Sequence, residues 1–209
     1  MLARSMKTET YSLSFTTGTL LHRESVVMAE QFLALQDWNA VRDAVVGKNL
    51  LQARTLNSSK RLCQEVSSRL KTLSEAEIDL VVKGTLQEQN YLLWLGVCRR
   101  YRFIADFAKE ILHERFIRLS PVLTYDDFDI FFNQKAEWHE EMDRIRPATK
   151  VKLRQVLFKM LREAGLLTTD NQITPALLSP RLIQAIAQEN PPDILIFPAF
   201  EFDLMQWAQ

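Results

Sequence analysis

The sequence predicts an all-α fold with two helix-turn-helix elements, the C-terminal one winged by a short β-hairpin. Glycine is scarce, at 5 of 209 residues, and apolar residues recur at helical spacing through most of the chain. Residues 144–174 read as a basic helix, a glycine stop and a hairpin, in the order found in a winged helix-turn-helix. Because Ser120-Pro121 breaks the chain, we predict an N-terminal helical domain over 1–120 and a C-terminal domain over 121–209.

Composition favours a cytoplasmic globular protein without a cofactor. Hydrophobic residues make up 47% of the chain, yet no stretch is long enough to cross a membrane, and the N-terminus lacks the apolar core of a signal peptide. Cys63 and Cys98 lie in apolar helical patterns, which is typical of buried thiols. The formal net charge is zero, but residues 1–120 carry 17 Lys and Arg against 13 Asp and Glu, whereas 121–209 carry 9 against 13.

Three helices are expected near the N-terminus. The first covers 20–35; the second covers 38–46, capped by Asp37 and stopped by Gly47. Asn57 or Ser58 would cap the third, which runs to Leu73. Its apolar face holds Leu62, Val66, Leu70 and Leu73, with Cys63 at the edge.

The outer face of this third helix is the N-terminal candidate site. Two cations lie in its first turn, where the helix dipole disfavours them and a bound phosphate would reverse the effect. We expect this face to bind duplex DNA as a helix-turn-helix, with an ordinary bundle helix as the alternative. Its residues are Lys60, Arg61, Gln64 and Lys71.

The middle of the chain should form the core. Ser74 and Glu77 make a capping box for a helix over 75–83. A long, aromatic-rich helix follows over 88–107, too apolar to face solvent. Its arginines, Arg99, Arg100 and Arg102, would either contact phosphates or pair with nearby acids, and we favour pairing.

The C-terminal half begins with an acidic helix, or two short ones, over 125–143. Thr124 and Asp127 form its cap, and its inward residues are Phe128, Phe131, Phe132 and Trp138. Pro147 opens the basic helix and Gly165 ends it. Leu166-Leu167 and Ile173-Thr174 then form the wing around 168–172. A helix over 177–189 and an apolar tail, expected to pack on the chain's own core, complete the chain.

The basic helix is the C-terminal candidate site. From Arg144 to Arg162 the chain carries seven cations and no acid. A solvated basic face is the alternative, but the helix, glycine and hairpin in order favour DNA, held mainly through phosphates. The residues expected to contact it are Lys150, Lys152, Arg154, Gln155, Lys159 and Arg162.

No motif in the sequence indicates catalysis or metal binding. The segment Trp138-His139-Glu140-Glu141 lacks the second histidine of a metalloprotease, and no phosphate-binding or nucleophile-elbow motif occurs. Two rivals to DNA binding remain. One is an adaptor that binds protein partners through the acidic helix and aromatic tail. The other is a nuclease, which would need Asp126, Asp127 and Asp129 to face one cleft.

Several segments together resemble the BrxA family of the BREX bacteriophage-exclusion systems of bacteria. They are RES at 23–25, DW at 37–38, NLLQ at 49–52, SSKR at 58–61, CRRYRFIADFAKEIL at 98–112, YDDFDIFF at 125–132 and TKVKLRQVLFKMLREAGLL at 149–167. The resemblance implies a cytoplasmic, helical, DNA-binding protein that works beside an adenine methyltransferase and other BREX components. It carries no catalytic residues. We expect the protein to be a monomer on its own.

Overall fold

The structure is a computed structural model that describes residues 10–16 and 18–200. The all-α prediction is confirmed, because every regular secondary-structure element in these residues is a helix. The first half contains α1 (His22–Leu35), α2 (Trp38–Gly47), α3 (Leu56–Leu70), α4 (Glu75–Lys83), α5 (Leu86–Arg100), α6 (Arg102–Phe107), the π-helix η1 (Ala108–His113) and α7 (Glu114–Ile117). The second half contains α8 (Tyr125–Ala136), α9 (Glu140–Asp143), α10 (Pro147–Glu163), α11 (Pro180–Glu189) and the 3₁₀ helix η2 (Pro191–Ile196).

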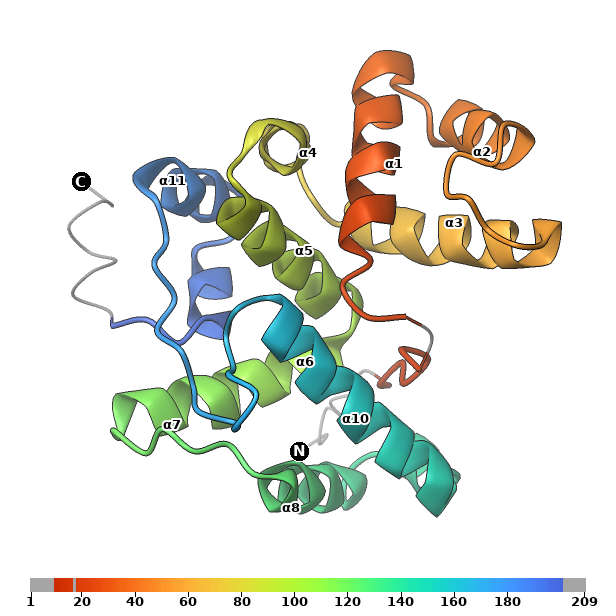
Figure 1. Ribbon diagram of the computed structural model, residues 1–209. Helices are drawn as coiled ribbons and strands as arrows, with labels where there is room; N and C mark the ends of the chain where they lie inside the picture. The colour runs from red at the N-terminus through yellow and green to blue at the C-terminus, as the bar shows by residue number, and fades with distance from the viewer. Residues whose placement is uncertain (1–9, 17, 201–209) are drawn as a thin grey trace, which may run out of the picture.

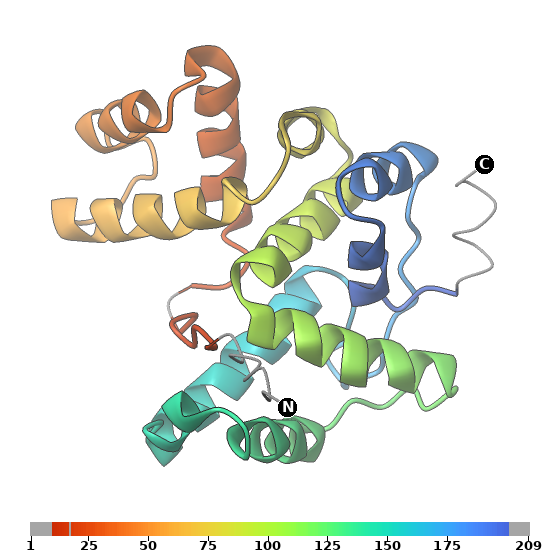
Figure 2. The same cartoon turned by 180° about the vertical axis from the view of Figure 1, so that it is seen from behind.

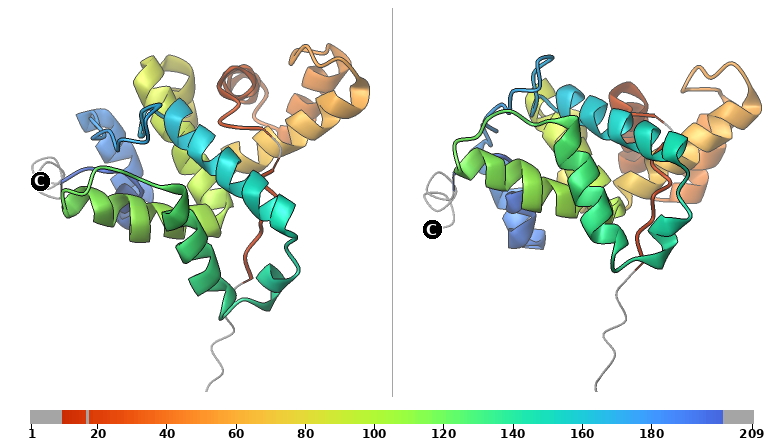
Figure 3. Two further views of the ribbon diagram at one scale, coloured as in Figure 1. Left: turned by 60° about the horizontal axis from the view of Figure 1, so that its bottom comes forward. Right: turned by 90° about the horizontal axis from the view of Figure 1, so that it is seen from below.

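The helices are arranged around α5, which crosses the middle of the molecule (Figure 1). α1, α2 and α3 pack on one another at one end, while α11 and η2 lie on the opposite side of α5; the reverse view agrees (Figure 2). α8 and α10 lie side by side along another edge (Figure 3), where the Tyr125 and Phe158 rings are 4.7 Å apart. The end of the molecule formed by α1–α3 therefore lies well away from the last described residues.

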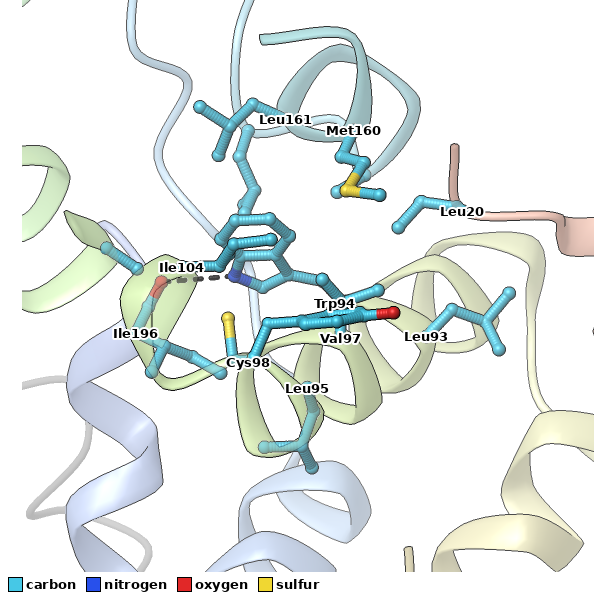
Figure 4. Packing of buried hydrophobic residues seen from close by; sticks show 14 of the residues in the cluster. Leu20, Leu93, Trp94, Leu95, Val97, Cys98, Ile104, Met160, Leu161 and Ile196 are labelled. Atoms are coloured by element: carbon cyan, nitrogen blue, oxygen red, sulfur yellow. Dashed lines mark hydrogen bonds between the residues drawn. The ribbon is translucent and has the colours of Figure 1, made fainter. Parts of the chain in front are cut away.

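Trp94 on α5 is at the centre of the core. Its ring is fully buried among residues from α5, α6, α10 and η2, and its indole N–H donates to the Ile196 carbonyl at 3.3 Å (Figure 4). The hydrogen bond satisfies the one polar atom that burial of the ring would otherwise leave unpaired. It also fixes η2 against α5, which confirms that the described part of the C-terminal tail packs on the chain's own core. Phe202 and Trp207 of that tail lie outside the described residues.

Local capping signals identified several helix starts correctly. Ser74 with Glu77 and Thr124 with Asp127 both form complete capping boxes, and Asp37 caps α2 as predicted. The cap of α3 was predicted wrongly: Thr55 takes this role, accepting from the Ser58 amide at 3.1 Å. Similarly, the C-terminal helix begins at Pro180 behind the Ser179 cap, not at Leu177.

The long apolar helix predicted over 88–107 is interrupted. Thr85 and Glu88 cap it earlier than expected, and Tyr101 adopts an extended conformation that separates α5 from α6. The Tyr101 ring is buried, and its hydroxyl donates to Glu65 of α3 at 2.7 Å. This tertiary contact accompanies a local break that the helical periodicity did not reveal.

The predicted β-hairpin wing is wrong. Leu167 and Ile173 form an isolated antiparallel bridge, and no strand occurs in the described residues. Pro175 cuts the second segment short. Residues 171–173 also bond to 121–123, where Ile173 donates to the Pro121 carbonyl at 2.7 Å. These short pairings make a connecting loop after α10 rather than a protruding wing.

Two predictions about burial in the acidic segment differ in outcome. Phe128, Phe131 and Phe132 are buried as expected. Trp138, predicted to point inward, is 75% exposed because it lies in the turn between α8 and α9. The division of the chain at residue 120 stays a prediction.

Candidate nucleic-acid interface

The outer face of α3 presents all four residues of the N-terminal candidate site. Its inner face is buried through Ser59, Cys63, Val66 and Leu70, which places Cys63 inside rather than at the edge. Lys60, Arg61, Gln64 and Lys71 are all exposed on the opposite side. Residues 48–55 join α2 to α3, a longer connection than the roughly three or four residues usual between the helices of this motif.

A line of polar side chains runs along this outer face. Asn57, Gln64 and Lys71 recur every seven residues, so they stand nearly above one another on the helix. All three are exposed. Asn and Gln carry the paired donor and acceptor that match an adenine edge, and lysine matches phosphate or guanine. The sequence-based prediction missed Asn57 because it was assigned to the helix cap.

Two hollows lie on either side of that line. The α2–α3 groove, of about 860 Å³, has a floor that includes Trp38, Val46 and Cys63 and a rim that includes Lys60 and Lys71. The smaller α3–α5 hollow, of about 240 Å³, is lined by Ser14, Arg61, Gln64, Glu65, Ser68 and Arg100. Gln64 and Ser68 line both, so α3 forms a ridge between two hollows with cations at their edges.

An aromatic stack supports the α2–α3 groove. The Phe32 and Trp38 rings stack with centroids 4.3 Å apart, which holds α1 against the start of α2. The Lys71 ammonium lies 5.8 Å from the Trp38 ring centroid, within the range of a cation–π interaction. The ring therefore orients Lys71 without neutralising its charge.

The predicted C-terminal site is partly occupied by the protein's own side chains. Lys150 and Arg154 both pair with Asp129 of α8, Lys150 at 3.4 Å. Arg154 also lies 4.8 Å from the Tyr125 ring centroid, and Arg162 donates to Asn171 at 2.6 Å. The acidic helix thus holds much of the basic face of α10.

The remaining residues of the C-terminal site face solvent. Lys152 and Gln155 are exposed, and Lys159 makes only a loose pair with Glu163, at 3.8 Å. The two candidate sites therefore differ: the α3 side chains are presented outward, while the α10 set is divided between internal ion pairs and solvent.

The carboxylates considered for a nuclease also have structural partners. Asp127 completes the α8 capping box and pairs with Arg115. Asp129 pairs with Arg154, as described above. Among the described residues, no group of three or more His, Cys, Asp or Glu is placed to hold a metal ion.

The arginines of the α5–α6 junction differ in their ion pairing. Arg99 is held by Glu77 at 2.6 Å and Asp193 at 2.7 Å, and Arg102 pairs with Asp106 at 3.7 Å. Arg100 makes no ion pair with a described residue and lines the α3–α5 hollow instead. A signal was present in the sequence: no acid lies three or four positions from Arg100, whereas Asp106 lies four beyond Arg102.

The two cysteines are free and buried, as predicted. Burial raises the pKa of the Cys63 thiol and raises that of Cys98 well above its ordinary value. Both thiols therefore stay protonated at neutral pH, which disfavours nucleophilic or metal-binding roles. No helix in the described ranges combines the length and apolar character needed to span a bilayer.

Fold and site define a class: an all-helical protein with a three-helix N-terminal unit whose third helix presents a basic, amide-bearing face. The BrxA family model matches residues 9–190. The chain belongs to the BrxA family, and so to the BREX phage-defence systems.

Individual relatives agree with this assignment. The chain is similar to the BREX protein BrxA of Escherichia coli O9:H4 (strain HS), with 28% identity covering 73% of this chain and 71% of that one. It is 26% identical to the BREX protein BrxA of Bacillus cereus (strain H3081.97), covering 78% and 81%. A crystal structure of an uncharacterized protein from Magnetospirillum magneticum shares the fold, with a TM-score of 0.78 and 19% identity over 91% of this chain and 98% of that one.

Proposed function

We propose that this protein is a non-catalytic DNA-binding component of a BREX phage-defence system, and that α3 is its main contact with duplex DNA. The supporting observation is the outward face of α3, where Lys60, Gln64 and Lys71 project between two hollows. An α-helix fits the major groove of B-DNA, and α1–α3 would then act as a helix-turn-helix unit.

Phosphate contacts would supply most of the affinity. Each lysine or arginine that neutralises a phosphate releases counterions, so affinity falls steeply with salt. Lys60 and Lys71 lie at the rim of the α2–α3 groove, which suits them to one sugar–phosphate strand. Gln64, at the crest of the ridge, is then the residue nearest the base edges.

We assign α10 a secondary role in this proposal. Asp129 already compensates Lys150 and Arg154, so a phosphate would have to compete with an existing carboxylate. Lys152, Gln155 and Lys159 remain presented to solvent and would add contacts on a longer duplex.

The proposal is tested by fluorescence anisotropy of a generic labelled duplex across a salt series. We would compare wild type with two variants that each remove two lysines, Lys60→Ala/Lys71→Ala on α3 and Lys152→Ala/Lys159→Ala on α10. The α3 variant should lower the magnitude of the slope of log affinity against log salt by about 1.8, that is about 0.9 for each lost phosphate contact. The α10 variant should change it less.

Each outcome has a defined meaning. If wild type, shown to be folded by circular dichroism, does not bind at low salt, the DNA-binding proposal fails. If it binds but only the α10 variant loses slope, the DNA contact belongs on α10 and the assignment to α3 is wrong.

A second candidate function is an adaptor for other BREX components, among them the adenine methyltransferase. Trp138 favours it: the indole is 75% exposed and lies between the exposed acids Glu137 and Glu140. Large exposed aromatic residues are enriched in protein interfaces. If wild type binds the purified methyltransferase in the presence of nuclease and Trp138→Ala does not, the result supports the adaptor function. If wild type and Trp138→Ala bind it equally, the surface around Trp138 is not the interface.

A further inference from the structure

The α3–α5 hollow contains an arginine, Arg100, that has no acidic partner among the residues the structure describes. Arg100 is the last residue of α5 and lies half-buried beside the outer face of α3. Its neighbours Arg99 and Arg102 are both ion-paired. A partly exposed guanidinium with no carboxylate in contact is available to pair with an anionic ligand.

The aromatic ring next to Arg100 fixes its position. The guanidinium carbon lies 5.1 Å from the centroid of the Tyr101 ring, which is held in turn by its hydrogen bond to Glu65. A guanidinium against a ring keeps the N–H groups at its edge available for a planar, two-pronged contact with a phosphate. The break between α5 and α6 at Tyr101 therefore places Arg100 as well as ending a helix.

The acid that lines the hollow is already engaged. Glu65 accepts from Arg69 at 2.8 Å and from the Tyr101 hydroxyl at 2.7 Å through the same oxygen, Oε1. Burial and this hydrogen bond raise the pKa of Tyr101 to about 12, so the hydroxyl stays a donor. With the charge of Glu65 offset by Arg69, the Arg100 guanidinium gives its side of the hollow a positive charge.

We propose that the α3–α5 hollow holds a backbone phosphate of the duplex whose groove receives α3, with Arg100 as the anchoring donor. The inference rests on the proposed function. It adds a contact from outside α3, on the side of the ridge opposite the α2–α3 groove. The two strands that border one groove would then be held on the two sides of α3, which fixes how the helix enters it.

The test uses the full-length protein and the same duplex and salt series. Arg100→Ala should lower the magnitude of the salt slope by about 0.9, so that the advantage of wild type over the variant shrinks about threefold between about 50 mM and about 200 mM salt. Arg100→Lys should restore most of the slope because it keeps the charge. The control is Arg118→Ala, which removes an equally charged, exposed residue that directly follows α7 in the chain. The helix α7 lies far from α3 (Figure 1).

The results separate this inference from the function on which it rests. A reduced slope in Arg100→Ala, with Arg100→Lys and Arg118→Ala close to wild type, supports the phosphate site. Salt-sensitive binding by wild type that Arg100→Ala leaves unchanged overturns the site but not the DNA-binding proposal. An equal loss in Arg118→Ala would show that only overall charge matters, and would also overturn it. Failure of wild type to bind removes both.

Discussion

Glu88 shows how one buried carboxylate connects distant parts of the chain. One of its oxygens accepts from the Ser179 hydroxyl at 2.6 Å and from Arg181 Nε at 2.7 Å; the other accepts from the Thr85 amide at 2.8 Å. The hydrogen bonds from Arg181 hold the pKa of Glu88 well below its usual range. A single side chain thus caps α5 and fixes the start of α11.

This arrangement predicts a specific loss of stability in acid. Because the pKa of Glu88 is lower in the folded than in the unfolded state, its contribution is full above the unfolded pKa, about 4.3, and is lost as pH falls toward the folded value. Glu88→Gln should lower the free energy of unfolding by about 1–2 kcal/mol at pH 7 and by less near pH 3. Urea denaturation at both pH values measures this, with Glu30→Gln on the exposed face of α1 as the control. An equal deficit at both pH values would contradict the assignment.

At the scale of elements, the end of α10 depends on one left-handed residue. Gly165 has φ +75°, and a Cβ at this position would lie 3.2 Å from the Gln87 amide nitrogen. Gly165→Ala should therefore destabilise the fold by about 1–2 kcal/mol. Gly47 ends α2 with open space around it, so Gly47→Ala should be neutral or stabilising by up to about 1 kcal/mol. Thermal unfolding of the two variants decides: equal shifts in the melting temperature would mean that backbone conformation is not the cause.

What the sequence predicted at this scale was mainly local. Capping boxes and the Gly165 stop depend on residues a few positions apart, so Ser74, Thr124 and Gly165 were identified from spacing alone. The break at Tyr101 was missed because its hydroxyl bonds to a residue 36 positions earlier. The wing failed for a similar reason, since 171–173 pairs with 121–123 as well as with its own hairpin partner.

For the candidate sites too, the sequence predicted what depends on one helix and missed what depends on the packing of two. Exposure of the α3 cations follows from the amphipathic pattern of one helix, so the outward position of Lys60, Arg61 and Lys71 was predicted, although Asn57 was missed. The pairing of Lys150 and Arg154 with Asp129 depends on how α8 packs beside α10, which composition does not encode. An acid-free basic run is therefore weak evidence of an unoccupied surface when an acidic helix precedes it.

At the scale of the whole molecule, Arg99 joins three separate segments. Its guanidinium donates to Glu77 of α4 at 2.6 Å, to Asp193 of η2 at 2.7 Å, and to the Thr72 carbonyl at 2.9 Å. Burial opposes the charged form, but the hydrogen bonds from Glu77 and Asp193 raise the pKa of Arg99. The ion pairs therefore connect η2 to α4 and α5.

Removing different members of this cluster should have unequal effects. Arg99→Met keeps the length of the side chain but leaves Glu77, which is fully buried, without its counter-charge, and should lower the free energy of unfolding by about 3–5 kcal/mol. Asp193→Asn keeps the pair between Arg99 and Glu77 and should cost about 1–2 kcal/mol. Urea denaturation ranks the two, and hydrogen exchange should show faster opening of 191–196 in both variants. If Asp193→Asn costs as much as Arg99→Met, the attachment of η2 rather than the buried charge of Glu77 dominates. Circular dichroism and duplex binding by Asp193→Asn then show whether α1–α3 keeps its proposed DNA-binding surface when the opposite end of the molecule is loosened.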